Sequence, residues 1–221
     1  MIAITPLVIA SALAVSLGSV AEAQVSRQST SVEPLDHCEG GIITLSSHIY
    51  QLPHRMTDDK PDNDDPEHSR LVRGLAVQPT GYTIEITMQA IPMRGSDRFC
   101  AGIDEVRVSA GVDPPVVWID PEVTDPCLRD AIKAHELEHV EHFHDYLDDF
   151  ERALSDIPDR FRPENRNLAR EDELDHVLET LGQRLQDHVE SVHATALSRM
   201  VRRDTSIDTP EEYRRVRQTC D

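Results

Sequence analysis

The sequence predicts an α+β fold, in which a small, mostly antiparallel N-terminal sheet precedes two long antiparallel helices. Three observations predict it. Short stretches rich in β-branched residues occupy the chain up to about residue 120. Beyond them, apolar residues recur at every third or fourth position over two long segments. Four widely spaced cysteines are typical of a domain stapled by disulfides.

Four segments have the composition of strands. The stretch 82–93, YTIEITMQAIPM, alternates apolar and polar residues, and this places Ile84, Ile86 and Met88 on one face. The other three are IITLSSHIYQL, EVRVSA and PVVWID, which begin at Ile42, Glu105 and Pro115. An edge of the resulting sheet is expected to line a cleft and to accept an extended peptide by strand addition.

The first long helix is predicted over residues 126–154. Asp125 followed by Pro126 supplies an N-cap and a first-turn proline, and no glycine or proline follows before Pro158.

The second long helix is predicted to begin between residues 163 and 171 and to end near Arg203. Its apolar positions recur at threes and fours: Leu174, Leu178, Leu181, Leu185, Val189 and Val192. The remaining tail, DTSIDTPEEYRRVRQTCD, predicts a turn and a short helix that Cys220 staples to the rest of the domain.

The N-terminus has the pattern of an export signal. Residues 1–23 are apolar and end in AEA, the small-x-small form of a cleavage site before Gln24. Because Lys and Arg are absent from its start, an uncleaved membrane anchor is the alternative. A flexible N-terminus, residues 24–37, and a single domain, residues 38–221, are expected to follow.

Cysteine and charge content point to the compartment and to the partners. In an exported chain Cys38, Cys100, Cys127 and Cys220 predict two disulfides, with three possible pairings, in a periplasmic or secreted protein. The formal net charge of −19 argues against nucleic-acid and anionic-membrane partners, because phosphate groups would be repelled. A basic or neutral polypeptide is the compatible partner, and the sequence leaves the oligomeric state open.

The stretch AIKAHELEHVEHFHDY lies within the first long helix. At 100° per residue, His135 and His139 share the face that carries Ile132, Phe143 and Phe150. Two buried imidazoles without ligands would leave polar groups unpaired, at about 1–3 kcal/mol each. A divalent metal removes that cost by binding one nitrogen from each ring.

Residues 135–139 have the HExxH arrangement, here HELEH, and resemble the zinc-binding helix of the zincin metallopeptidases. The broader layout resembles the predicted secreted zinc-dependent proteases of bacteria. The resemblance implies that His135 and His139 bind Zn²⁺, and that Glu136 is the general base of a zinc-dependent endopeptidase that hydrolyses peptide bonds with metal-activated water.

A third ligand is expected from the second helix. If the two helices pack antiparallel across a short connection, the segment opposite the motif spans about residues 180–188. His188 lies on the apolar face there and is the predicted ligand, with Glu179 and Asp187 as alternatives. Four further side chains are candidates for supporting the site or stabilising a transition state: His142, Tyr146, His193 and Tyr213.

A second function from another class fits the same residues. The protein is then a non-catalytic exported metal-binding or assembly protein, in which the histidine-rich helix stores or senses a metal.

Overall fold

The computed structural model describes residues 26–27, 33–38, 41–59 and 73–220, so the predicted export signal lies outside the described part. The predicted α+β class is confirmed. Most strands precede the long helices: β1 (Ser26–Arg27), β2 (Thr44–Ile49), β3 (Arg55–Thr57), β4 (Gly74–Val77), β5 (Tyr82–Pro92), β6 (Arg98–Ala110), β7 (Val116–Ile119), α1 (Pro126–Leu154), α2 (Ile157–Phe161), a 3₁₀ turn (Arg162–Glu164), β8 (Asn167–Arg170), α3 (Leu174–Ile207) and α4 (Pro210–Gln218).

The strands form two sheets. One has the order β1-β5-β6-β2, with β8 also paired to β6, and the other has the order β3-β7-β4. The predicted predominance of antiparallel pairing is confirmed, but the pairing is mixed, because β1–β5, β2–β6 and β3–β7 are parallel pairs. Among the described strands, only β5 and β6 form a hairpin, turned at Gly95, whereas β2 reaches β6 through intervening strands and pairs parallel to it.

Part of the predicted flexible N-terminus pairs with the sheet. Ser26 and Arg27 form β1 beside β5, and the Leu35 amide donates to the Pro92 carbonyl at 3.0 Å.

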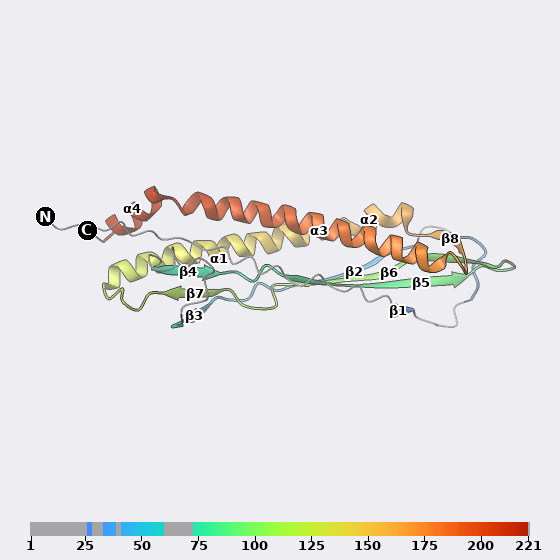
Figure 1. The fold of residues 1–221 in the computed structure, drawn as a ribbon, viewed down its shortest axis with the longest axis horizontal. Coiled ribbons are helices and arrows are strands. Elements are labelled where there is room, and N and C mark those ends of the chain that lie inside the picture. The colour runs from blue at the N-terminus through green and yellow to red at the C-terminus, as the bar shows by residue number, and fades with distance from the viewer. Residues whose placement is uncertain (1–25, 28–32, 39–40, 60–72, 221) are drawn as a thin grey trace.

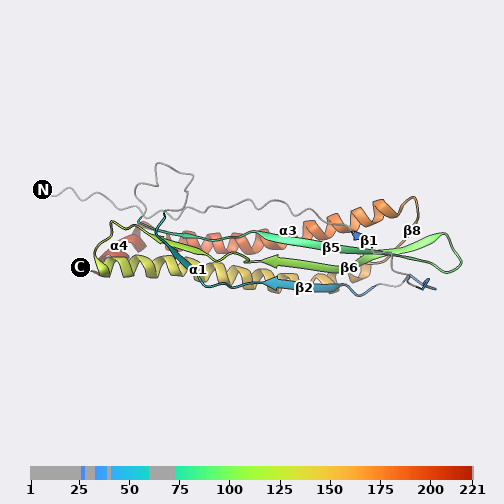
Figure 2. The ribbon, with the colours of Figure 1, turned by 90° about the horizontal axis from the view of Figure 1, so that it is seen from below.

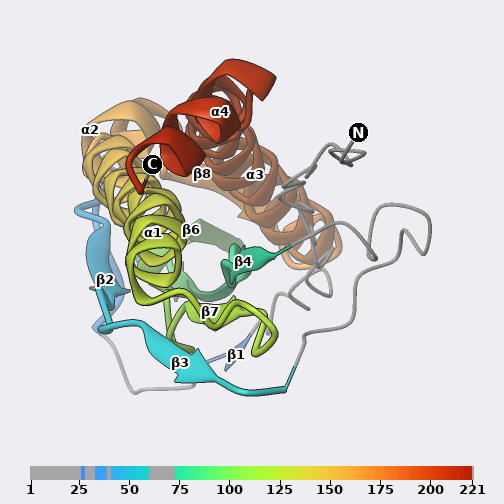
Figure 3. The same ribbon diagram turned by 90° about the vertical axis from the view of Figure 1, so that its left-hand side faces the viewer.

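The helices cover one face of the sheets. Figure 1 shows α1 and α3 running in opposite directions along an elongated molecule, and Figure 2 shows β5, β6 and β2 in front of them when the molecule is turned. Seen end-on in Figure 3, α1, α3 and α4 all lie on the same side of the strands. The main core fills this interface, with the alternating residues Ile84, Ile86 and Met88 of β5 facing the helices' apolar residues Phe143, Leu147, Phe150, Leu181 and Leu185.

The first helix has the predicted bounds. Asp125 is its N-cap, and its side chain accepts a hydrogen bond from the Leu128 amide at 3.0 Å. Pro126 lies at the first helical position, where a missing N–H costs nothing.

The described helical part contains shorter helices besides the two long ones, α1 and α3, and α3 starts later than predicted. Between α1 and α3 the chain forms α2, a 3₁₀ turn and β8. The buried side chain of Asn165 holds this connection to the sheet, because its Oδ1 accepts from the Ile103 amide at 2.7 Å and its Nδ2 donates to the Ile103 carbonyl at 2.9 Å. The longer connection shifts α3 along α1, so that the end of α3 faces the HELEH segment.

Two disulfides are present, as predicted, and they pair Cys38 with Cys100 and Cys127 with Cys220. The second one staples α4, the predicted short C-terminal helix, to the start of α1. Disulfides indicate folding in an oxidising, exported environment. Among the described residues, no helix combines the length and the apolar character needed to cross a bilayer.

Candidate metal centre

The HELEH segment of α1 faces the interior. His135 is 3% exposed, Glu136 0% and His139 2%. Such burial of three ionisable side chains is unusual unless they are paired or bind a metal.

Asp208 brings a carboxylate to the two histidines. Its Oδ1 lies 3.3 Å from Nε2 of His135 and 3.3 Å from Nε2 of His139. A tetrahedral ion with bonds of 2.0–2.2 Å separates its ligand atoms by about 3.3–3.6 Å, so these two distances match two edges of such a tetrahedron. The three side chains form a group whose ligand atoms all lie within 4.8 Å of one another and could hold a metal ion.

The junction between α3 and α4 positions Asp208. It is the C-cap of α3, and its amide donates to the Asp204 carbonyl at 3.1 Å. Thr209 then caps α4 by accepting from the Glu212 amide, and Pro210 begins that helix. From α4, the Tyr213 hydroxyl donates to Asp208 Oδ1 at 3.0 Å. Two helix ends therefore fix this carboxylate over the histidine pair.

A second carboxylate orients His139 from behind. Nδ1 of His139 lies 3.0 Å from Oδ1 of the buried Asp204, and Nδ1 of His142 lies 2.8 Å from the same oxygen. When both Nδ1 atoms donate to Asp204, Nε2 of His139 keeps its lone pair and points toward Asp208. A histidine fixed in this way by a carboxylate is the usual arrangement around protein-bound metals.

Glu136 is close to the group without belonging to it. Both of its carboxylate oxygens are buried and lack a hydrogen-bond partner among the described residues. Burial raises the pKa of Glu136 to about 7, although His139, His135 and the nearby Ala76 amide partly oppose the shift. β4 lies directly against this side chain, because a Cβ added at Gly74 would come within 2.5 Å of Glu136 Oε1.

The carboxylates make the centre attractive to cations. Burial alone would lower the pKa of His139, but Asp204 and Asp208 outweigh burial and raise the pKa to about 10. The metal-free group therefore holds protons that a metal ion must displace.

The predicted third ligand lies elsewhere. His188 is sixteen positions before Asp204 on α3, which is about 24 Å at 1.5 Å per residue. Its ring packs 5.5 Å from that of Phe161 in α2, and its pKa is lowered by burial and by Arg160. The alternatives Glu179 and Asp187 are exposed on the same stretch of α3. The structure does not bring any of the three to the histidine pair.

The other candidate side chains divide into two groups. His142 and Tyr213 contact the centre through Asp204 and Asp208. Tyr146 donates to the Thr80 carbonyl at 3.0 Å, and His193 lies 2.8 Å from the same oxygen, so both belong to the core between helices and sheet.

Asp204 and Asp208 were missed because the length of the connection between the helices was misjudged. One signal pointed to them. They are four residues apart at the end of a long helix, as His135 and His139 are four apart near the start of another. Antiparallel helices that meet at those ends align the two pairs.

The chain matches no protein-family model, no curated protein and no solved structure.

Proposed function

We propose that the protein is an exported zinc-dependent endopeptidase. The observation that carries the proposal is the position of Asp208 Oδ1, 3.3 Å from both His135 Nε2 and His139 Nε2, beside a buried carboxylate that is not a member of the group. Two imidazoles with one carboxylate suit zinc, whereas calcium and magnesium prefer oxygen ligands alone.

A bound zinc ion would act there as a Lewis acid on a peptide carbonyl. It would also lower the pKa of a bound water, so that the water can lose a proton and attack that carbonyl. Glu136 is the proposed general base. It takes the proton from the attacking water and returns it to the leaving amine. No other function is assigned to this carboxylate by its contacts, since it has no hydrogen-bond partner among the described residues.

Tyr213 and β4 complete the proposed machinery. The Tyr213 hydroxyl donates its one proton to Asp208 Oδ1, and by turning that proton from Asp208 to the substrate it would become the donor to the oxygen that gains charge during the reaction. β4 is an end strand of its described three-stranded sheet and lies against Glu136. An extended polypeptide added to its outer edge would pass next to the general base.

One observation favours the second candidate, a non-catalytic exported metal-binding protein. His135 and His139 are almost completely buried, and the Asp208 side chain is only 15% exposed. Structural metal sites are closed in this way, whereas a catalytic site needs an open position for water and substrate.

The mature chain, purified without added metal, tests both candidates. We expect about one zinc per chain by mass spectrometry and slow hydrolysis of an unfolded, weakly basic protein. The hydrolysis should stop after treatment with a chelator and return when zinc is added. Zinc without hydrolysis would favour the second candidate. Hydrolysis that persists in zinc-free protein would contradict the proposed mechanism.

A further inference from the structure

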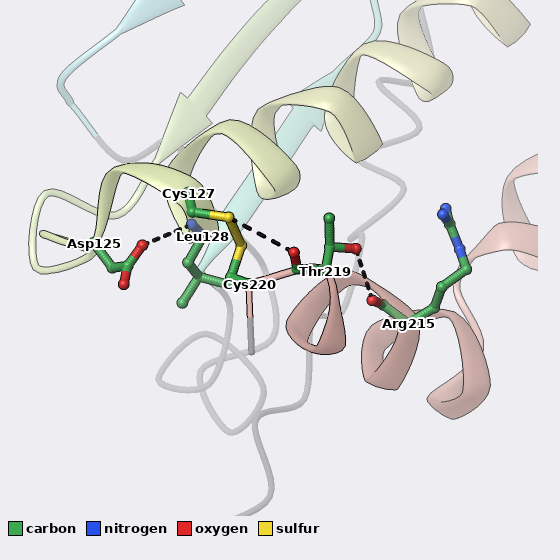
Figure 4. The surroundings of a disulfide bond; sticks show 6 residues. All are labelled: Asp125, Cys127, Leu128, Arg215, Thr219 and Cys220. Carbon is green, nitrogen blue, oxygen red and sulfur yellow. Dashed lines mark hydrogen bonds between the residues drawn. A yellow bond between two sulfur atoms is a disulfide. The ribbon is translucent and has the colours of Figure 1, made fainter.

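The carboxylate of the centre reaches it from the C-terminal end of the chain, and that end is crosslinked. Figure 4 shows the Cys127–Cys220 disulfide, which joins the first turn of α1 to the residue that follows Thr219 beyond α4. We call α4 together with this disulfide the C-terminal clasp. Asp208 lies immediately before the clasp and Tyr213 lies within it.

Besides the disulfide, a small set of contacts holds α4 against α1, among them Glu212 near His135 and Arg215 near Glu138. Its apolar contribution is one small cluster in which Val216 packs with Ile119, Val123 and Ile132. The buried ring of Tyr213 adds an edge contact with His135, with ring centroids 5.8 Å apart. A helix of nine residues is not stable by itself, so its position depends on these contacts and on the crosslink.

The Cys127–Cys220 disulfide lies at the surface, far from the Cys38–Cys100 disulfide. Cys127 is exposed, and its Sγ lies 3.9 Å from the Thr219 carbonyl oxygen. The bond joins residues 93 positions apart, so breaking it removes the covalent link between the last segment of the chain and the start of α1. The Cys38–Cys100 disulfide instead joins the segment before β2 to β6. It lies where β6 pairs with β8, at the opposite end of the molecule in Figure 1.

We propose that Cys127 and Cys220 are positioning residues for the metal centre, because their disulfide keeps Asp208 and Tyr213 against His135 and His139. This inference rests on the proposed metal site. It adds that the zinc affinity of the site depends on whether the Cys127–Cys220 disulfide is oxidised or reduced. With the bond intact, three ligands surround the ion. With the bond broken, α4 separates from α1 and the two histidines are left to bind it without a fixed carboxylate.

Matched double variants test the proposal. Cys127→Ser with Cys220→Ser removes the clasp disulfide and leaves no thiol that could bind zinc itself. Cys38→Ser with Cys100→Ser removes the distant one. We expect the zinc Kd, measured by competition with a chromophoric chelator, to rise about 10–100-fold in the first variant, as when a supporting partner of a metal ligand is lost. It should change less than about threefold in the second.

The visible absorption spectrum of bound Co²⁺ reports the coordination number of the ion, which a general loss of stability would not change. Co²⁺ in the wild-type centre should give the intense visible bands of a four-coordinate ion, and the clasp variant should give the weak bands of a higher-coordinate one. Both spectra are recorded on protein with native circular dichroism. A clasp variant that keeps the wild-type zinc Kd and cobalt spectrum would overturn the proposal.

Reduction of the folded wild-type chain repeats the test if the variant fails to fold. A water-soluble phosphine gives two electrons to the disulfide, two protons from water complete the Cys127 and Cys220 thiols, and the water oxygen becomes phosphine oxide. Blocking the thiols with iodoacetamide, followed by mass mapping, identifies the chains in which only this pair was reduced. Those chains should show the same rise in zinc Kd, and an unchanged Kd would overturn the proposal.

The two proposals fail in different ways. An oxidised wild-type chain that binds no zinc would remove the metal site and the clasp's effect on it together. A wild-type Kd that is the same with and without the clasp disulfide would leave the metal site standing and remove only the clasp's role.

Discussion

Replacing Glu136 by Gln should lower kcat for peptide hydrolysis by about 10²–10⁴-fold while the zinc content stays at the wild-type value. The carboxylate belongs to none of the metal-binding groups, so its loss should leave the ligand atoms in place. Gln has nearly the same shape but takes up no proton from water. Because burial disfavours the charged form of Glu136 more than its neighbours stabilise it, we also expect the neutral variant to be no less stable to unfolding.

The matched control is Glu141→Gln, which removes an exposed charge from the same helix. It should keep wild-type kcat, KM and zinc content. Full activity in Glu136→Gln would show that this carboxylate is not the base. Loss of zinc in Glu136→Gln would show that it is a ligand.

Replacing Asp208 by Ala should raise the zinc Kd by at least about 100-fold, because it removes a ligand and not only a supporting partner. Its Oδ1 is the atom that lies 3.3 Å from both histidine Nε2 atoms. Hydrolysis should fall with zinc occupancy and recover in part at high zinc concentration. Tyr213→Phe removes only the hydroxyl that donates to Asp208, and it should have a much smaller effect on the zinc Kd.

His188→Ala is the comparison that separates the structural account from the sequence-based prediction. The ring lies against Phe161, far along α3 from Asp204, so its removal should leave the zinc Kd unchanged. If His188→Ala weakened zinc binding and Asp208→Ala did not, the sequence-based ligand would be right and the proposed centre wrong.

The sequence was sufficient for features that depend on local periodicity. The bounds of α1 follow from Asp125, Pro126 and the absence of a breaker before Pro158. The inward direction of His135 and His139 follows from the spacing of apolar residues on that helix. The alternating face of β5 was predictable in the same way.

The sequence was insufficient where a feature depends on the alignment of distant segments. The identity of the third ligand depends on how α3 is aligned along α1, and that alignment depends on the connection between the two helices. β8 pairs with β6, and Asn165 fills the hydrogen-bonding positions of Ile103 in the same strand. Neither the β6–β8 pair nor the contact between Asn165 and Ile103 can be predicted from the periodicity of a helix or a strand. The parallel arrangement of β2 and β6 was missed for the same reason.

Anomalous X-ray scattering at the zinc absorption edge, from crystals of the oxidised chain with one equivalent of zinc, locates the ion that we propose His135, His139 and Asp208 to hold. We expect a single strong peak about 2.0–2.2 Å from Nε2 of both histidines and from an Asp208 oxygen. A peak on other side chains, such as His188 or the pair of His142 and Asp204, or the absence of any peak, would contradict it.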